Sequence, residues 1–179
     1  EETDRVFMEN VMAMVNDGAS MAKVADTFKV VYTPFHGCGW KLVPEALRAL
    51  GVKHLYCVEQ QMVLDGNFPT VASPNPENPE GFYLAIELAD KVGADFILGT
   101  DPDSDRVGIM VRGADGKFIA VTGNQTGVLL LDYLIGAMRR AGKMPENPYF
   151  LKTIVTTEMA RKVAESNGVT CCDTFTGFK

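Results

Sequence analysis

The sequence lacks the features that mark a secreted, membrane-spanning or nucleic-acid-binding chain. It has only four cysteines, and none of them forms a C-x-x-C pair. An apolar run such as Val128–Leu131 is far too short to span a bilayer, and no signal peptide is visible. The formal net charge of −6 disfavours nucleic acid and anionic membranes as partners, because either would select a basic face. We therefore expect reduced thiols, a cytoplasmic location, and neither a membrane nor a nucleic-acid partner.

The size and composition of the chain are typical of a folded, soluble protein. Its 179 residues fit one large domain, or one domain with part of another. Apolar residues make up 46% and charged residues 22%, which allows an ordinary buried core. The sequence has no initiator methionine, opens within a predicted helix and stops at residues 176–179, directly after a predicted strand. We therefore expect a piece of a longer chain.

Alternating helical and strand patterns predict an α/β fold of two consecutive units. The predicted helices are 5–15, 40–50, 81–92, 128–140 and 157–166, and the predicted strands are 29–32, 52–58, 94–98, 107–111, 117–121, 150–155 and 169–173. We expect mixed, mainly parallel sheets flanked by helices, with the second unit incomplete because it has too few strands. The expected divisions are a helical lead-in at 1–25, an α/β domain at 26–120 and a partial α/β domain at 121–179.

Three carboxylates follow the apolar strand 94–98 at alternate positions. Asp101, Asp103 and Asp105 can direct three oxygens at one hard cation, and Arg106 beside them can neutralise charge or contact a phosphate. The carboxyl end of a parallel strand is where open α/β sheets bind their ligands. A solvated acidic turn is the alternative, but three clustered carboxylates without a cation repel one another. The spacing therefore predicts a metal site.

Two other acidic motifs fit this loop poorly. An EF-hand that begins at Asp101 needs glycine at its sixth position and glutamate at its twelfth, where this sequence has Arg106 and Arg112. An aspartyl-phosphate phosphatase uses D-x-D-x-[TV], and the fifth position here is Asp105. The EF-hand interpretation therefore fails, and the phosphatase interpretation is weak.

The segment Gly-Thr-Asp-Pro-Asp-Ser-Asp-Arg closely resembles the metal loop of the α-D-phosphohexomutases, the phosphoglucomutase/phosphomannomutase family. Four further segments resemble loops of that family in the family's order, namely 32–37, 66–77, 123–127 and 176–179. The resemblance covers most of the chain. It implies the whole second domain and about the first half of the third domain of a four-domain enzyme.

The resemblance also implies an activity. In this family a phosphoserine of the first domain gives its phosphoryl group to a hexose phosphate. The resulting bisphosphate reorients and returns its other phosphate to the serine. Glucose 1-phosphate and glucose 6-phosphate are examples of the sugar phosphates that are interconverted. Mg²⁺ would be held by the three aspartates, and the remaining domains of the parent chain would be the protein partner. The site residues implied are Asp101, Asp103 and Asp105 for the metal, Arg106 and Lys152 for catalysis, and His36, Thr176, Gly177 and Lys179 for the substrate.

Ser73 lies in a segment that resembles a catalytic loop, but the position of that segment in the chain argues against a catalytic role. The segment Val71–Pro76 resembles the family's phosphoserine loop, yet that loop belongs to the first domain, and Ser73 precedes Asp101 by only 28 positions. We therefore expect the nucleophile to lie outside this chain, and the chain alone to be inactive.

Several alternatives stay open at this point. His36 is either a cleft residue or a hydrogen-bonded loop histidine, and Lys152 is either a cleft cation or a surface lysine with a buried stem. Phosphoglucomutase, phosphomannomutase and phosphopentomutase are all possible activities, although 34–37 and 176–179 lean towards the phosphoglucomutase/phosphopentomutase branch. A non-catalytic module that binds a metal or a phosphate is the alternative of a different class.

Overall fold

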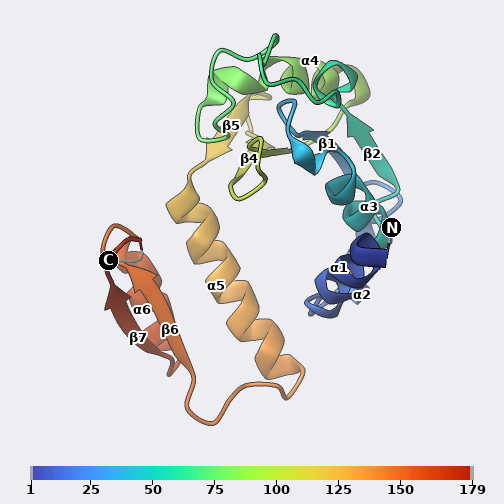
Figure 1. Ribbon diagram of the computed structural model, residues 1–179. Helices are drawn as coiled ribbons and strands as arrows, with labels where there is room; N and C mark the ends of the chain where they lie inside the picture. Colours follow the sequence, from blue (N-terminus) through green and yellow to red (C-terminus); the bar gives the residue numbers. More distant parts are fainter. Residues whose placement is uncertain (1, 178–179) are drawn as a thin grey trace. The chain divides into compact units, whose positions relative to one another are not determined.

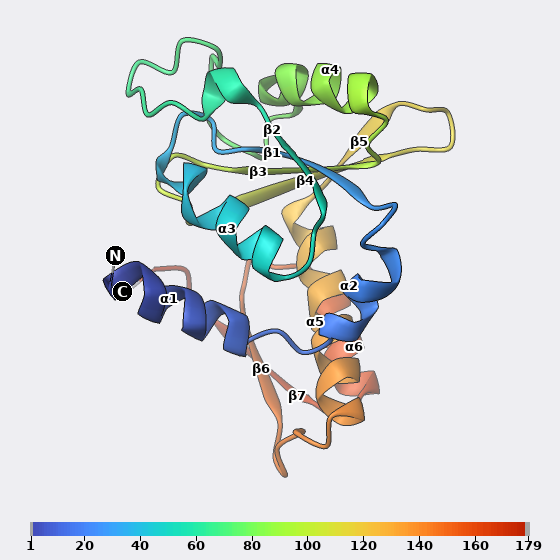
Figure 2. The ribbon, with the colours of Figure 1, turned by 90° about the vertical axis from the view of Figure 1, so that its right-hand side faces the viewer.

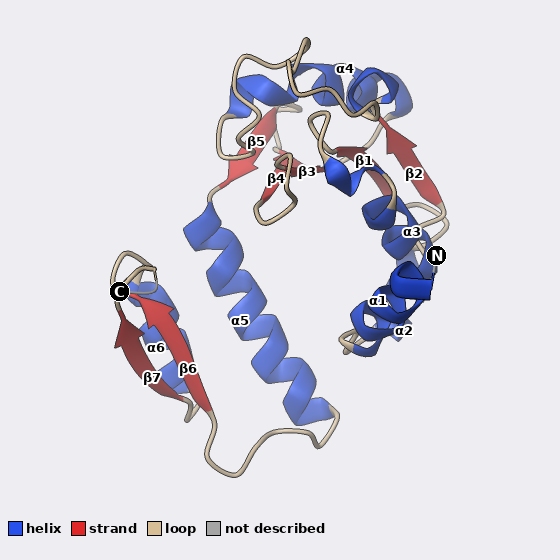
Figure 3. Cartoon of the chain, viewed as in Figure 1, coloured by secondary structure: helices blue, strands red, loops and turns tan. Residues whose placement is uncertain are grey.

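The computed structural model describes residues 2–177, and these divide into two compact units. Unit 1 is Glu1–Thr122 and unit 2 is Gly123–Lys179. Both units contain helices and strands, as Figures 1 and 3 show, and unit 1 ends in three successive strands. No helix within residues 2–177 is long and apolar enough to cross a membrane.

Unit 1 is built on a five-stranded mixed sheet with the order β2-β1-β3-β4-β5. The strands are β1 (Lys29–Thr33), β2 (His54–Cys57), β3 (Phe96–Thr100), β4 (Val107–Arg112) and β5 (Phe118–Val121). Strand β1 pairs in parallel with β2 and β3, whereas β4 pairs antiparallel with β3 and β5. Figure 2 shows α4 (Tyr83–Val92) on one face of this sheet and α3 (Leu42–Ala49) on the other. The predicted fold class is confirmed.

The core of unit 1 lies between the sheet and α4. Val31 and Ile97, which are register partners on β1 and β3, are both fully buried there. The α4 sequence places Ala85 and Ala89 one turn apart on the buried side, so the helix can approach the sheet closely. The helix ends at Gly93, whose left-handed backbone (φ 67°) is easily adopted by a residue without a Cβ.

Two helices precede the sheet in unit 1. They are α1 (Glu2–Ala13) and α2 (Gly18–Val24), and Asp17 caps α2 by accepting a hydrogen bond from the backbone N–H of Ser20. Apolar side chains of α1 and α3 line a hollow of about 270 Å³. Three short 3₁₀ turns lie at Cys38–Trp40, Glu59–Gln61 and Pro79–Phe82. The first of them delays the start of α3 to Leu42, two residues later than predicted.

Unit 2 is a small two-stranded parallel sheet with two helices. Its elements are α5 (Gly123–Arg140), β6 (Tyr149–Thr153), α6 (Glu158–Ser166) and β7 (Thr170–Thr174). Leu131 and Ile135 of α5 pack against Ala160 and Ala164 of α6. Thr157 caps α6, because its hydroxyl oxygen accepts the backbone N–H of Met159. Helix α5 starts five residues earlier than predicted, since its glycine-containing opening reads as a loop.

Candidate metal centre

The three predicted metal ligands converge at the carboxyl end of β3. One carboxylate oxygen from each of Asp101, Asp103 and Asp105 lies within 4.8 Å of the other two. Asp101 is fully buried, whereas Asp103 and Asp105 are exposed. The group therefore has one fixed member at the strand end and two members that are open to solvent.

A tight turn brings these side chains together. The carbonyl of Asp101 accepts the N–H of Ser104 at 3.0 Å, and the N–H of Asp101 donates to the carbonyl of Arg106 at 3.3 Å. Ser104 completes the turn with a positive φ of 60°. The chain thus reverses within five residues and returns as β4, the antiparallel neighbour of β3.

Arg106 holds the buried carboxylate of the group. Its backbone N–H donates to Oδ1 of Asp101 at 2.9 Å, and its Nε donates to Oδ2 at 2.8 Å. Burial alone would raise the pKa of Asp101, but its hydrogen bonds, first those from Arg106 and then those with Asp105 and Asp103, together lower that pKa below its usual value. Asp101 is therefore ionised at neutral pH.

Asp105 experiences the opposite electrostatic effect. Its hydrogen-bond interaction with Asp101 and repulsion by Asp103 raise the pKa of Asp105, and Arg106 only partly offsets this. A raised carboxyl pKa means that neighbouring groups destabilise the ionised form of the carboxyl. A cation bound among the three carboxylates would reduce that repulsion.

The turn after β1 supports the acidic loop from one side. A Cβ added at Gly37 would lie 2.2 Å from Cα of Pro102, and the N–H of Cys38 donates to the carbonyl of Pro102 at 2.8 Å. Gly37 therefore lets the backbone of this turn lie directly against the backbone of the acidic loop. Gly39 is crowded instead by side chains, the hydroxyl groups of Tyr32 and Ser104. Sequence reasoning gave this contact no role, although a G-x-G after a strand was the available signal.

His36 lies inside this turn with its ring buried. Its Nδ1 is 2.9 Å from the carbonyl oxygen of Val63, and its Nε2 is 2.9 Å from Oγ1 of Thr70. Both ring nitrogens are therefore engaged within unit 1. This favours the hydrogen-bonded loop histidine over the cleft residue.

Ser73 is part of the long loop between β2 and α4. Its side chain is half-buried, and its Oγ accepts a hydrogen bond from Nδ2 of Asn78 at 3.0 Å. This contact fits a role in bracing the loop.

Lys152 lies in unit 2, on β6, and its side chain is 1% exposed. The ammonium contacts Oε1 of Glu158 at 2.7 Å, Oδ1 of Asp173 at 2.9 Å and the carbonyl of Thr156 at 3.2 Å. Hydrogen bonds to Glu158 and Asp173 raise the pKa of Lys152. The surface-lysine alternative is therefore wrong, because carboxylates from α6 and β7 hold the whole side chain inside.

The end of unit 2 contains the predicted sugar-facing segment. Thr176 and Gly177 follow β7 and are exposed, and Gly177 has a positive φ of 76°. Lys179 lies outside the described residues. The structure thus brings together Asp101, Asp103, Asp105 and Arg106 in unit 1. Of the other predicted residues, His36 lies in the neighbouring turn of unit 1, and Lys152, Thr176 and Gly177 belong to unit 2.

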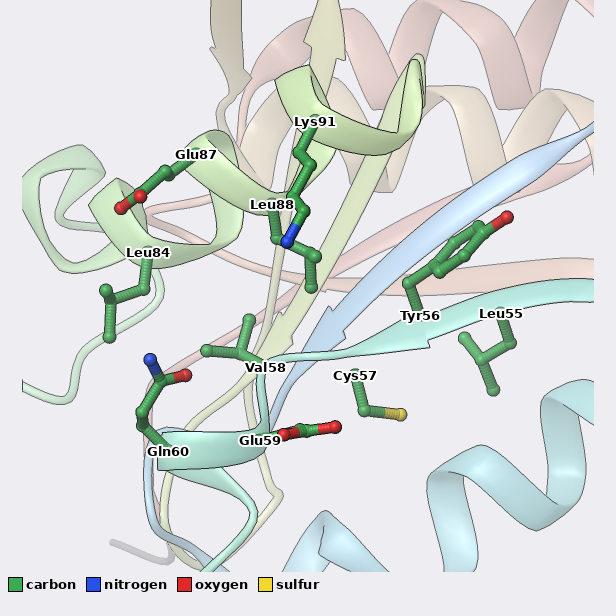
Figure 4. A pocket seen from close by; sticks show the side chains of 10 residues that line it. All are labelled: Leu55, Tyr56, Cys57, Val58, Glu59, Gln60, Leu84, Glu87, Leu88 and Lys91. Atoms are coloured by element: carbon green, nitrogen blue, oxygen red, sulfur yellow. The ribbon is translucent and has the colours of Figure 1, made fainter.

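A separate hollow of about 500 Å³ lies between the edge strand β2 and α4. Figure 4 shows Leu84, Leu88 and Lys91 of α4 facing the strand across it. Its lining residues are Leu55, Tyr56, Cys57, Val58, Glu59, Gln60, Leu84, Glu87, Leu88 and Lys91. None of the predicted site residues is among them, so the candidate metal centre lies on the acidic loop and not in this hollow.

Two family models together match almost the whole chain. The model for phosphoglucomutase/phosphomannomutase α/β/α domain II matches residues 6–116, and the model for domain III of the same family matches residues 122–179. Phosphoglucomutases of Staphylococcus epidermidis RP62A and Staphylococcus aureus MRSA252 are each 39% identical to the chain over 151 residues. That stretch is 84% of this chain but 27% of either relative, so the chain spans about a quarter of their length.

Solved structures share the fold at lower sequence identity. A phosphoglucomutase/phosphomannomutase family protein of Burkholderia thailandensis has a TM-score of 0.64 at 22% identity, over 84% of this chain and 30% of that one. The N-acetylphosphoglucosamine mutase of Aspergillus fumigatus, solved with GlcNAc-6P and magnesium, has a TM-score of 0.57 at 13% identity. That match covers 90% of this chain and 34% of the other.

Proposed function

Because this chain belongs to the phosphoglucomutase/phosphomannomutase family, we propose that it forms the metal-binding part of a Mg²⁺-dependent sugar-phosphate mutase. The reaction is the exchange of hexose 1-phosphate and hexose 6-phosphate through a phosphoserine and a bisphosphate. The observation that carries the proposal is the convergence of Asp101, Asp103 and Asp105 at the carboxyl end of β3.

The donor set of the acidic loop suits magnesium. Mg²⁺ prefers oxygen ligands about 2.0–2.1 Å away, binds through few carboxylates and keeps positions for water or a phosphate oxygen. Three oxygens within 4.8 Å can reach one such ion after small movements of the exposed Asp103 and Asp105. When bound, the ion would neutralise charge on a phosphoryl group in transfer. The Aspergillus relative solved with magnesium and GlcNAc-6P lends support.

The other predicted residues take roles that follow from their charge. Arg106 fixes Asp101 in its ionised form and offers a guanidinium, half exposed, to an incoming phosphate. Lys152 keeps its proton because of its two carboxylate partners, and it supplies a fixed positive charge in unit 2. Thr176, Gly177 and Lys179 are proposed to contact the sugar.

The nucleophilic serine is proposed to lie on another part of the enzyme. The matched relatives are far longer than this chain, which covers 27% of each. Ser73 hydrogen-bonds within its own loop and does not belong to the acidic group. Phosphoglucomutase is the activity we favour, since the curated relatives at 39% identity carry that name.

Mg²⁺ dependence tests the proposal. The full-length enzyme that contains these residues is assayed for conversion of glucose 1-phosphate across a range of Mg²⁺ concentrations, with Asp103→Asn and Asp115→Asn as variants. Asp115 is a matched control, because it is an exposed loop aspartate of the same unit that caps a hairpin turn. We expect Asp103→Asn to lower kcat by more than about a hundredfold, since loss of a ligand costs at least as much as loss of its supporting contacts. Equal activity of the two variants would sink the proposal.

A further inference from the structure

Four polar side chains near the metal centre have no part in the proposed reaction. They are Thr33 at the end of β1, His36 in the following turn, Gln61 in the 3₁₀ turn after β2, and Thr70 in the long loop. Thr33 and Gln61 are fully buried, and His36 is 4% exposed. Buried polar groups are costly unless they are hydrogen-bonded, so a cluster of them calls for an explanation.

Their hydrogen bonds form one chain with a single consistent direction. The carbonyl of Val63 can only accept, so Nδ1 of His36 carries a hydrogen, and in the neutral ring Nε2 then accepts from the hydroxyl of Thr70. Thr70 in turn accepts from Nε2 of Gln61 at 3.0 Å, and Oε1 of Gln61 accepts from the hydroxyl of Thr33. No buried side-chain nitrogen or oxygen in residues 2–177 lacks a partner. Each of the four side chains thus has at least one hydrogen-bond partner within the network.

This network encloses an unusual piece of backbone. Phe35 and His36 both have positive φ angles, 46° and 65°, a region that residues with a Cβ seldom adopt and a bulky phenylalanine least of all. The N–H of Phe35 donates to Oγ1 of Thr33, and the N–H of His36 donates to the carbonyl of Gln61 at 3.0 Å. The Phe35 ring packs edge-on against Phe82, with the centroids 5.0 Å apart. Side chains on both sides therefore hold the conformation that the backbone disfavours.

The residues that directly follow Phe35 and His36 contact the acidic loop. Gly37 lies against Pro102, and the N–H of Cys38 donates to its carbonyl at 2.8 Å. Pro102 stands between the first two metal-ligand candidates. From these contacts we infer that the Thr33–Gln61–Thr70–His36 network positions the metal loop, with His36 and Thr70 as positioning residues rather than substrate contacts. This inference rests on the proposed metal site.

The test removes one hydroxyl and keeps the shape of the side chain. Thr70→Val leaves Nε2 of His36 and Nε2 of Gln61 without their shared partner, whereas Thr70→Ser retains the hydroxyl. Two controls match it: Thr27→Val makes the same chemical change at an exposed site of unit 1, and Val52→Ala removes buried volume away from the network. The readouts are the affinity of the chain for Mn²⁺ by paramagnetic resonance and the exchange rate of the Cys38 amide by NMR.

We expect Thr70→Val to weaken Mn²⁺ binding by about tenfold or more, the usual effect of losing a contact behind a metal ligand, and to speed exchange of the Cys38 amide. Thr70→Ser should restore both values, and neither control should change them while the chain stays folded. The inference is overturned if Thr70→Val matches Thr27→Val in both readouts, or if Val52→Ala reproduces its effects. If the unsubstituted chain binds no Mn²⁺, the proposed metal site fails, and the Cys38 amide still decides whether the network holds the loop.

Discussion

Gly37→Ala is the substitution whose effect can be worked out most directly from the structure. Gly37 has φ −96° and ψ −179°, an extended conformation that alanine adopts without strain. The added Cβ would nevertheless lie 2.2 Å from Cα and 2.5 Å from the carbonyl oxygen of Pro102. Ordinary contacts of a Cβ begin near 3.4 Å, so the two backbones must separate by roughly an ångström. The cost is therefore steric and falls on the acidic loop.

The expected magnitude follows from the cost of overpacking. Inserting one carbon into a tightly packed site typically destabilises a protein by about 1–3 kcal/mol, and here the hydrogen bond from Cys38 to Pro102 is lost as well. Gly66→Ala is the matched control, because an added Cβ there meets no atom within 4 Å. The measurements are the free energy of unfolding in urea and the affinity for Mn²⁺. We expect both to fall for Gly37→Ala and neither to fall for Gly66→Ala; indistinguishable variants would refute the steric reasoning.

Three further outcomes are expected. Lys152→Met should destabilise unit 2 by leaving Glu158 and Asp173 with only one of their two shared cations, the partly exposed Arg161, whereas Lys162→Met, at an exposed position of α6, should have little effect in the same thermal melts. Because the pKa of Lys152 is raised, the stability it contributes is complete below the ordinary lysine pKa of about 10.4 and is lost as pH rises through the higher folded value; a melt that is insensitive to alkali would contradict this. Ser73→Ala should leave the mutase activity of the full-length enzyme within about twofold of the unsubstituted enzyme, because we assign Ser73 to bracing its loop; a loss above a hundredfold would make it the nucleophile.

The fold class could be predicted because its signals are local. Strands β1 and β3 are nearly continuous apolar runs, and α4 carries small and apolar residues at helical spacing before a terminal glycine. These patterns depend only on neighbouring residues. The start of α5 was misplaced because Gly123 and Gly127 are typical of loops, whereas in the structure both lie within the helix, which begins at Gly123.

The candidate site was predicted only in part. The D-x-D-x-D-R spacing indicates which carboxylates gather, since all of them lie on one short turn. The environment of His36 was left undecided because its partner Thr70 is 34 positions away and lies on a loop without periodic pattern. Lys152 posed the same problem, since Asp173 comes from the other strand of its sheet. Long-range pairings of this kind depend on the finished fold.

Arg106, which pairs with Asp101, also sets the net charge of the acidic loop. Three carboxylates and one guanidinium leave the loop with two negative charges when all four groups are ionised. A divalent ion brings that local charge to zero, whereas a monovalent ion leaves a deficit. A sugar phosphate, itself an anion, would then approach a loop that no longer repels it. In the proposed metal site, the arginine next to the last aspartate would thus match the charge of the loop to a divalent cation and reduce its repulsion of an anionic substrate.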